Sequence, residues 1–262
     1  MAVIYDSAPL KTRVRKSLAD EHKHEAIKTA QNVISGKRDA LVETAVGWEE
    51  FRASAARIRD HVIKNLDYYV KQFAESAQRA GCTVHFAPTG GDAVEAVLDI
   101  FQEIGETSCV KAKSMMTEEI GLNEYLAEHG IEATETDCAE HILQTAGDAP
   151  SHIVVPALHF DRTKIRDLYR EKLGYEGSDD PEEITRFLRA TLRPQFMAAR
   201  VGVTGCNFAV AETGTCTLVT NEGNGRMVSS LPETQIVVVG VERIVPDLQS
   251  LDVMMELLVR SA

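Results

Sequence analysis

The run AVAETGTCTLV contains the first group of residues whose types could do chemistry, Glu212-Thr213-Gly214. Small apolar residues lead up to a single carboxylate, and a glycine and threonines surround it. A glutamate held at a strand end among apolar neighbours can have a raised pKa and can act as a general base or nucleophile. The alternative is a hairpin turn that leaves the carboxylate in water. Both interpretations stay open, and Glu212 is our candidate base.

A second group follows closely, in the glycine-rich segment Asn221-Glu222-Gly223-Asn224-Gly225-Arg226. Asn224-Gly225 is typical of a type I′ turn, because both positions tolerate a positive φ. Exposed amides in such a turn, together with Arg226, could hold a carboxylate or a phosphate. The alternative is a plain tight turn with a surface arginine. We therefore take the whole segment as a candidate binding site for a small acid.

A third group lies where a short strand gives way to a helix, in Lys111-Ala112-Lys113-Ser114. Ligands of open α/β sheets bind beyond the carboxyl ends of the strands, so Lys113 and Ser114 are candidate binding residues. The alternative is that Lys111 and Lys113 face solvent and that Thr117 is only a helix cap. A weaker candidate, Thr89-Gly90-Gly91-Asp92, opens a helix, but its two glycines make neither a phosphate-binding loop nor a dinucleotide fingerprint.

Histidines and cysteines do not predict a metal site. The eight histidines show no ligand spacing on one helix face, and no G-x-S-x-G elbow suggests a serine hydrolase. The five cysteines are odd in number and widely spaced, which fits buried thiols in a reducing compartment. No closely spaced cysteine run could ligate an iron–sulfur cluster. Cys206 and Cys216 flank the AETGT segment and are interpreted as small buried hydrophobes.

Alternating strands and helices must position these groups. From residue 82 onward we expect strands over 83–87, 109–112, 131–136, 152–158, 201–204 and 235–240, a β pair across 208–219, and helices between them. The pattern predicts an α/β fold with a mixed, mostly parallel sheet and helices on both faces. Apolar residues at steps of three and four from Trp48 to Phe73 predict one long amphipathic helix. We divide the chain into an N-terminal helical extension, 1–80, and an α/β domain, 81–262.

Composition limits the classes of function. The chain has 262 residues, 28 basic and 40 acidic, for a net charge of −12. This balance argues against nucleic-acid binding and against attachment to anionic lipid. No apolar run reaches the roughly 18 residues of a membrane span, and the first residues lack the core of a signal peptide. The sequence therefore predicts a cytoplasmic, globular protein.

Five segments in order resemble the LUD domain family, and within it the lactate utilisation protein B subfamily, an iron–sulfur subunit of bacterial L-lactate oxidation. The resemblance runs from about residue 15 to the last residue. The segments are KAKSMMTEEIGLNEYL, GIEATETDCAEHILQ, SHIVVPALH, TGCNFAVAETGTCTLVTNEGNGRMVSSLP and VVVGVERIVP. The resemblance implies a fold similar to the NagB/RpiA/CoA-transferase-like sheets and a cytoplasmic complex of three subunits that converts L-lactate to pyruvate. The signature residues it implies are Lys113, Ser114, Glu118, Glu119, Asn207, Glu212, Thr213, Gly214, Asn221, Glu222, Gly223, Asn224 and Gly225.

Two departures from this family follow from the sequence. Cys206 stands where alanine is more usual, and the given sequence ends at Ala262, before the cysteine clusters that resemblance implies. We therefore expect no cofactor in this chain and [4Fe-4S] clusters in a full-length homologue. The favoured hypothesis is a LUD-domain portion of a lactate-oxidising complex that binds a small hydroxy or keto acid, or a partner subunit. The alternatives are an assembly module that docks partners through the helix of Trp48 and Phe51, and acyl-transfer chemistry on CoA esters with Glu212 as nucleophile.

Overall fold

The computed structural model describes residues 8–151 and 155–261, and its contacts divide the chain into two units. The first unit comprises the described residues up to Gln31 together with Thr89–Thr204 and Thr220–Ile236. The second comprises Asn32–Pro88, Gly205–Val219 and the described residues from Val237 onward. The expected division at residue 80 stays a prediction.

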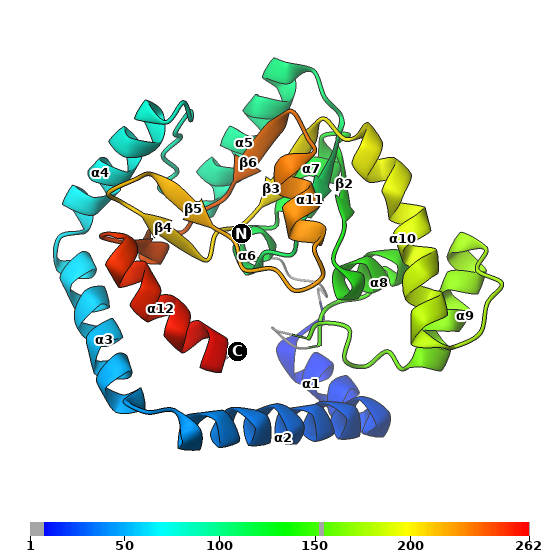
Figure 1. The fold of residues 1–262 in the computed structure, drawn as a ribbon. Helices are drawn as coiled ribbons and strands as arrows, with labels where there is room; N and C mark the ends of the chain where they lie inside the picture. Colours follow the sequence, from blue (N-terminus) through cyan, green and yellow to red (C-terminus); the bar gives the residue numbers. More distant parts are fainter. Residues whose placement is uncertain (1–7, 152–154, 262) are drawn as a thin grey trace. The chain divides into compact units, whose positions relative to one another are not determined.

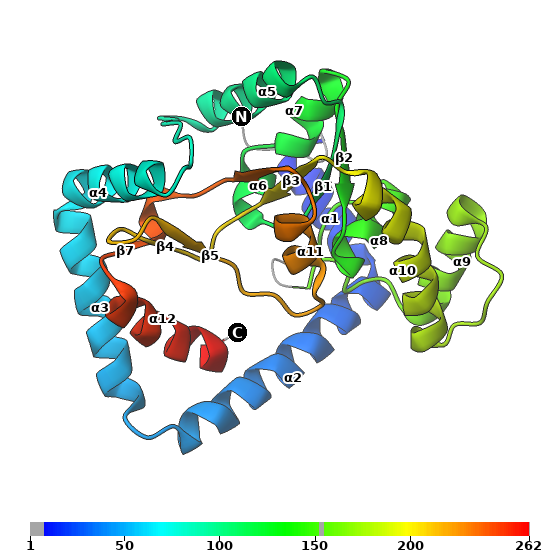
Figure 2. The same cartoon turned by 45° about the horizontal axis from the view of Figure 1, so that its top comes forward.

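A four-stranded sheet in the order β2-β1-β3-β6 is the centre of the first unit (Figures 1 and 2). Its central strand β1 is parallel to β2 and to β3, and Lys111 is in register with Glu135 on one side and with Val203 on the other. The carboxyl ends of these three strands therefore lie at one edge of the sheet. The strands are β1 Ser108–Lys111, β2 Glu132–Glu135, β3 Val201–Thr204 and β6 Thr234–Val237.

Among the described residues, five helices of the first unit begin at a side-chain cap that the local sequence supplies. Thr89 and Asp92 form a reciprocal capping box at the start of α5. Asp180 accepts from two backbone N–H groups of α10, with Pro181 in the first helical position. The helices are α1 Leu10–Ala19, α5 Gly90–Ile104, α6 Met115–Glu119, α7 Leu122–Glu128, α8 Cys138–Ala146, α9 Arg162–Leu173, α10 Pro181–Ala198 and α11 Asn224–Ser230.

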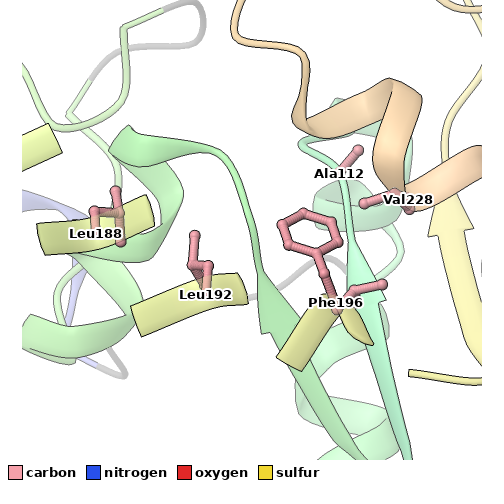
Figure 3. Packing of buried hydrophobic residues seen from close by; sticks show 6 residues of the cluster. Ala112, Leu188, Leu192, Phe196 and Val228 are labelled. Atoms are coloured by element: carbon pink, nitrogen blue, oxygen red, sulfur yellow. The ribbon is translucent and has the colours of Figure 1, made fainter. Parts of the chain in front are cut away.

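Apolar packing fixes α10 and α11 against one face of this sheet. Val110 and Ala112, at the end of β1, contact Phe196 of α10 and Val228 of α11 in one buried cluster (Figure 3). Side chains alternate along a strand, so Lys111 points to the opposite face. There its ammonium group contacts Glu118 of α6. The same alternation thus places an apolar core on one face of β1 and a charged group on the other.

The second unit contains a three-stranded mixed sheet in the order β5-β4-β7. β4 is antiparallel to β5 and parallel to β7. One face of β4 packs through Ala209 and Ala211 against α3 and α4, and the other packs through Phe208 and Val210 against α12. The elements are α3 Trp48–Lys64, α4 Leu66–Arg79, β4 Phe208–Val210, β5 Thr215–Thr217, the 3-10 turn η1 Val241–Arg243, β7 Ile244–Val245 and α12 Leu248–Ser261.

The structure confirms an α/β fold with a mostly parallel sheet. It also confirms helices near the N-terminus, among them α2 Glu21–Thr44, α3 and α4. The expected single helix from Trp48 is wrong in one respect. It is two helices separated at Asn65, whose side chain turns back to donate to the carbonyl of His61. Residues 83–87 are not a strand, and 155–158 form turns instead of a strand; residues 152–154 of that expected strand lie outside the described residues.

The expected turn at Asn224-Gly225 is also wrong. Asn224 begins α11, and the positive φ of +84° falls on Gly223, one residue earlier. Glycine adopts that conformation without the steric cost of a Cβ, so the chain reverses at Gly223 and leaves Asn224 free to start a helix. Pro194 lies inside α10, which continues to Ala198.

Candidate functional site

A buried ion pair lies at the carboxyl ends of β1 and β2. Nζ of Lys111 donates to Oε1 of Glu135 over 2.6 Å, and the two residues are 0% and 2% exposed. Burial alone would lower the pKa of Lys111, but the carboxylates of Glu135 and Glu118 outweigh it and raise that pKa. Lys111 is therefore charged, and β1 carries a fixed positive charge into the core of the unit.

Two further residues complete a strand-end cluster around this pair. Glu118 of α6 accepts from Lys111 Nζ at 3.4 Å, and Asn123 of α7 donates to Glu135 Oε1 at 2.7 Å. Among the described residues, Oε2 of Glu135 and Oδ1 of Asn123 are buried and accept no hydrogen bond. Such atoms are costly unless something donates to them. The cluster thus has two acceptor atoms available for a donor.

Glu140, in the first turn of α8, is the titratable member of this neighbourhood. It is buried, and desolvation together with the nearby carboxylates of Glu135 and Glu118 raises its pKa to about 7. Lys111 and Lys113 oppose that rise. A carboxyl group with a pKa near neutral pH can accept and return a proton under ordinary conditions. Glu140 therefore has the protonation behaviour that a general base requires.

The turn between β2 and α8 is held by residues from two other segments. Thr136 donates from its hydroxyl to the Lys111 carbonyl at 2.8 Å, and Asn224 Nδ2 donates to that hydroxyl at 3.2 Å. Oε2 of Glu222 accepts from the backbone N–H of Cys138 at 3.1 Å. The glycine-rich segment before α11 is thereby joined to the end of β1 and to the start of α8.

Lys113 lies within electrostatic reach of both groups of carboxylates, since it lowers the pKa of Glu140 and of Glu222. Desolvation and Asp137 nevertheless leave the pKa of Glu222 raised. Ser114 is buried and caps α6, where its Oγ accepts from the Thr117 N–H at 3.3 Å. The structure thus brings Lys113 within electrostatic reach of Glu222 in the glycine-rich segment, and a binding role for Lys113 and Ser114 stays a prediction.

The remaining residues of the glycine-rich segment lie around this turn. Asn221 and Arg226 are exposed, and Gly225 is buried within α11. Gly223 takes the positive φ that opens the helix. A role for any of them in binding a ligand stays a prediction.

Glu212, Thr213 and Gly214 belong to the second unit, at the turn between β4 and β5. The side chain of Glu212 is exposed, while its carbonyl accepts from Ser76 Oγ at 3.1 Å. Thr213 donates to Thr215 between hydroxyl groups at 2.8 Å. Gly214 has a φ of +71°, and a Cβ there would overlap the backbone of α4. This geometry matches the turn interpretation of the segment, and the assignment of Glu212 as a base stays a prediction.

Asn207, also in the second unit, fastens the start of the β4–β5 hairpin. Its backbone N–H donates to the Thr217 carbonyl at 2.8 Å, and its Oδ1 accepts from the Val219 N–H at 2.8 Å. The backbone N–H and the side-chain oxygen of Asn207 therefore both form hydrogen bonds to residues of the β5 side of the hairpin. Its contribution is to the shape of the hairpin, and a binding role stays a prediction.

Sequence reasoning missed Glu135, Glu140 and Asn123, and it considered Lys111 only in the alternative that places this lysine in solvent. A lysine inside the apolar strand SCVK was a signal, because such a charge must find a partner when it is buried. The partner lies 24 residues later in the acidic run EATETD, on a strand that becomes adjacent only when the sheet forms. Spacing within either segment does not reveal that pairing.

A second polar group, away from the strand-end cluster, joins Ser151, His159 and Asp148. Nδ1 of His159 lies 2.8 Å from Ser151 Oγ, and Nε2 lies 3.1 Å from Asp148 Oδ2. The three residue types are those of a hydrolytic triad. The Ser151 N–H, however, donates to the Pro156 carbonyl and cannot stabilise an oxyanion. We interpret the group as a clasp that holds the loop before α9.

The residues present do not fit an iron–sulfur cluster. Within residues 8–151 and 155–261, no group of three or more histidine, cysteine or acidic side chains is arranged to hold a metal ion. Cys82 is exposed, Cys109 is buried in β1, and Cys138 begins α8. A cluster needs four thiolate ligands brought together, so we derive no step through one.

Within residues 8–151 and 155–261, no helix is long and apolar enough to cross a membrane.

Comparison with known proteins assigns the class. Residues 70–262, which include both sheets, match the family model of the LUD domain, and the chain belongs to that family. It is 47% identical over its full length to an uncharacterized electron transport protein, YkgF, of Escherichia coli K12. It is 48% identical over 95% of its length to lactate utilization protein B 2 of Bacillus mycoides and to lactate utilization protein B of Bacillus cereus B4264.

The chain spans about half the length of these relatives, 55% of the first and 53% of the other two. No solved structure gives a significant match. The expected similarity to CoA-transferase-like sheets therefore stays a prediction.

Proposed function

We propose that this chain is the LUD-domain portion of an L-lactate-utilising redox complex and that it binds a small hydroxy or keto acid in its first unit. The single observation that carries the proposal is the gathering of buried charges at the carboxyl ends of β1 and β2, around the Lys111–Glu135 pair. In open α/β sheets this edge is where ligands bind. Buried charges that shift each other's pKa are also more frequent at functional sites than elsewhere.

The acid's carboxylate would pair with Lys113, and its hydroxyl would donate to a carboxylate. Lys113 suits the first role because it follows the end of β1 and its charge reaches both Glu140 and Glu222. Glu140 suits the second, since a pKa of about 7 lets it accept the hydroxyl proton while the two electrons and the second proton of the oxidation would pass to an acceptor elsewhere in the complex. Asn221–Arg226 would close the site from the side of α11.

Glu212 is the competing candidate for the base, from the family signature. It is exposed and belongs to the second unit, whereas Glu140 is buried beside other charged groups. We assign to this chain the binding of the acid and the transfer of its proton, and no electron-transfer step. The [4Fe-4S] clusters of the lactate-oxidising system would lie outside the residues described.

The test is calorimetric titration of L-lactate and of pyruvate into the full chain and four variants. Removing a charge-assisted hydrogen bond costs about 1.5–3 kcal/mol, so Lys113→Ala should weaken binding roughly 10- to 100-fold. Lys172→Ala, an exposed lysine of α9, is the matched control and should bind as the wild type does.

Glu140→Gln and Glu212→Gln decide between the two candidate bases. A lactate anion bound beside Glu140 should raise its pKa further, so that Glu140 takes up a proton on binding near neutral pH. Glu140→Gln should abolish this uptake, measured as a dependence of the binding heat on the ionisation enthalpy of the buffer, and Glu212→Gln should keep it. The reverse result would move the base to the second unit. Absence of heat from either acid with the wild type would remove the substrate role.

Partner docking is the second candidate function, and one observation favours it. Leu10, Val14 and Leu18 of α1 are exposed at steps of four, so they form one apolar stripe. On α2, Val33, Ile34 and Leu41 are also exposed. We propose that these helices dock the other subunits of the complex.

Replacing Val14 and Leu18 with aspartate in the full chain tests the docking role. It should abolish co-purification with the other subunits, while Lys11→Asp and Lys16→Asp on the same helix should retain it. Unchanged co-purification of the Val14 and Leu18 variant would contradict docking through α1.

A further inference from the structure

Two thiols of the second unit lie on the same face of its hairpin. Cys216 of β5 pairs directly with Ala209 of β4. Cys206 packs in the apolar cluster that contains Ala209 and Ala211. Residues paired across antiparallel strands point to the same face. Cys206 and Cys216 therefore both border the face of β4 that carries Ala209, although ten positions separate them in the sequence.

The sulfur atoms also interact directly. Hydrogen bonding between the two thiol groups lowers the pKa of Cys206 and raises that of Cys216. When Cys206 is protonated, its S–H donates to the Phe208 carbonyl at 3.0 Å, and because Phe208 is paired with Thr217 of β5 this contact places the sulfur beside that strand. Arg243 adds a positive charge that favours the Cys206 thiolate.

The other described cysteines differ from this pair in the pKa of their thiols or in having no cysteine partner beside them. Burial raises the pKa of Cys109 to about 12 and that of Cys138 to about 11, so both stay protonated and unreactive at neutral pH. Cys82 is exposed. In the pair, Cys216 is exposed and Cys206 is half-buried, so a reagent in solution can reach the site.

We propose that Cys206 and Cys216 form a redox-active dithiol that exchanges with small-molecule or protein disulfides. The Cys206 thiolate attacks one sulfur of a disulfide RSSR, the S–S bond breaks, and one RS⁻ leaves and takes up a proton. Cys216 then gives up its proton to solvent and attacks the Cys206 sulfur, which expels the second RS⁻. The products are an intrachain disulfide and two RSH, and two electrons have passed from the dithiol to RSSR.

The experiment treats the reduced full chain with oxidised glutathione, quenches with acid and alkylates the remaining thiols. Trypsin cleaves after Arg200 and Arg226, so one peptide, residues 201–226, contains both cysteines. We expect this peptide to be unalkylated and lighter by two hydrogen atoms, and dithiothreitol to reverse the change. Recovery of the peptide with two alkylated thiols, or with glutathione still attached, would overturn the proposal.

Variants separate the two roles. Cys216→Ser should trap a stable glutathione adduct on Cys206, because the resolving thiol is gone. Cys206→Ala should leave Cys216 reacting at least tenfold more slowly with glutathione disulfide than Cys206 does. Cys82→Ser is the matched control and should form the intrachain disulfide at the wild-type rate.

Circular-dichroism melting confirms that each variant is folded before its chemistry is compared. If a folded Cys216→Ser variant gave no adduct on Cys206, the proposal would be wrong. A Cys216→Ala variant, which tests the same loss without a hydroxyl, replaces it if the serine variant does not fold.

Discussion

Replacing Lys111 with methionine should destabilise the first unit strongly. The substitution keeps an apolar stem of similar length, but it leaves the Glu135 carboxylate buried without its cation. Removing one partner of a buried pair costs about 3–5 kcal/mol. That is a large part of the roughly 5–15 kcal/mol by which a folded domain is stable. We therefore expect Lys111→Met to fold only marginally.

Urea unfolding followed by circular dichroism measures this cost. With a slope of about 2–3 kcal/mol per molar urea, the unfolding midpoint should fall by roughly 1–2.5 M. The double variant Lys111→Met/Glu135→Met removes both charges and should recover most of the loss, except the hydrogen bond from Asn123. Lys172→Met, an exposed lysine, is the control and should stay within about 0.5 kcal/mol of the wild type.

A small shift for Lys111→Met would refute the reasoning. If its midpoint fell by less than about 0.5 M, water or a rearranged side chain would be compensating Glu135, and the pair would not be the fixed charge that we infer. A double variant as unstable as the single one would also contradict it, because the loss would then come from packing of the lysine stem.

Two further predictions concern pH and the hairpin. Folding raises the pKa of Glu140 from 4.5 to about 7. The contribution of Glu140 to stability is therefore fully present below pH 4.5 and is lost as pH rises through 7. In urea titrations, Glu140→Gln should be roughly 2–3 kcal/mol more stable than the wild type at pH 8, and this gain should be absent at pH 4. In thermal melts, Gly214→Ala should lower the stability of the chain more than Gly223→Ala does. A Cβ at 214 overlaps the backbone of Ala77, whereas a Cβ at 223 meets nothing within 4 Å. Equal losses of about 1–2 kcal/mol, from the positive φ alone, would contradict this.

Local signals in the sequence were sufficient for much of the fold. Asp180-Pro181 is such a signal, because a capping aspartate followed by a proline marks the first turn of α10. The alternation of strands and helices predicted β1, β2 and β3 of the parallel sheet. These signals work because a cap or a turn is decided by neighbours within three or four residues. The apolar periodicity from Trp48 likewise predicted helix, although it could not show the break at Asn65.

The candidate site was less predictable, because its contacts join distant segments. Lys111 and Glu135 are 24 residues apart, and Cys138 and Glu222 are 84 apart. The local pattern at Asn224-Gly225 predicted a turn there, but the chain turns at the neighbouring Gly223 and Asn224 begins α11. Glu212 stood out by its surroundings in sequence, whereas Glu140 looked like an ordinary residue in the first turn of a helix. Its raised pKa comes from charges that only the folded sheet brings near it.

A crystal soaked with pyruvate tests the central proposal most directly. Our account predicts difference density beside the end of β1, with the pyruvate carboxylate within hydrogen-bonding distance of Lys113 Nζ and its keto oxygen facing Glu140. Density at Glu212 in the second unit, or an unchanged map at Lys113 under pyruvate concentrations that give calorimetric binding, would contradict it.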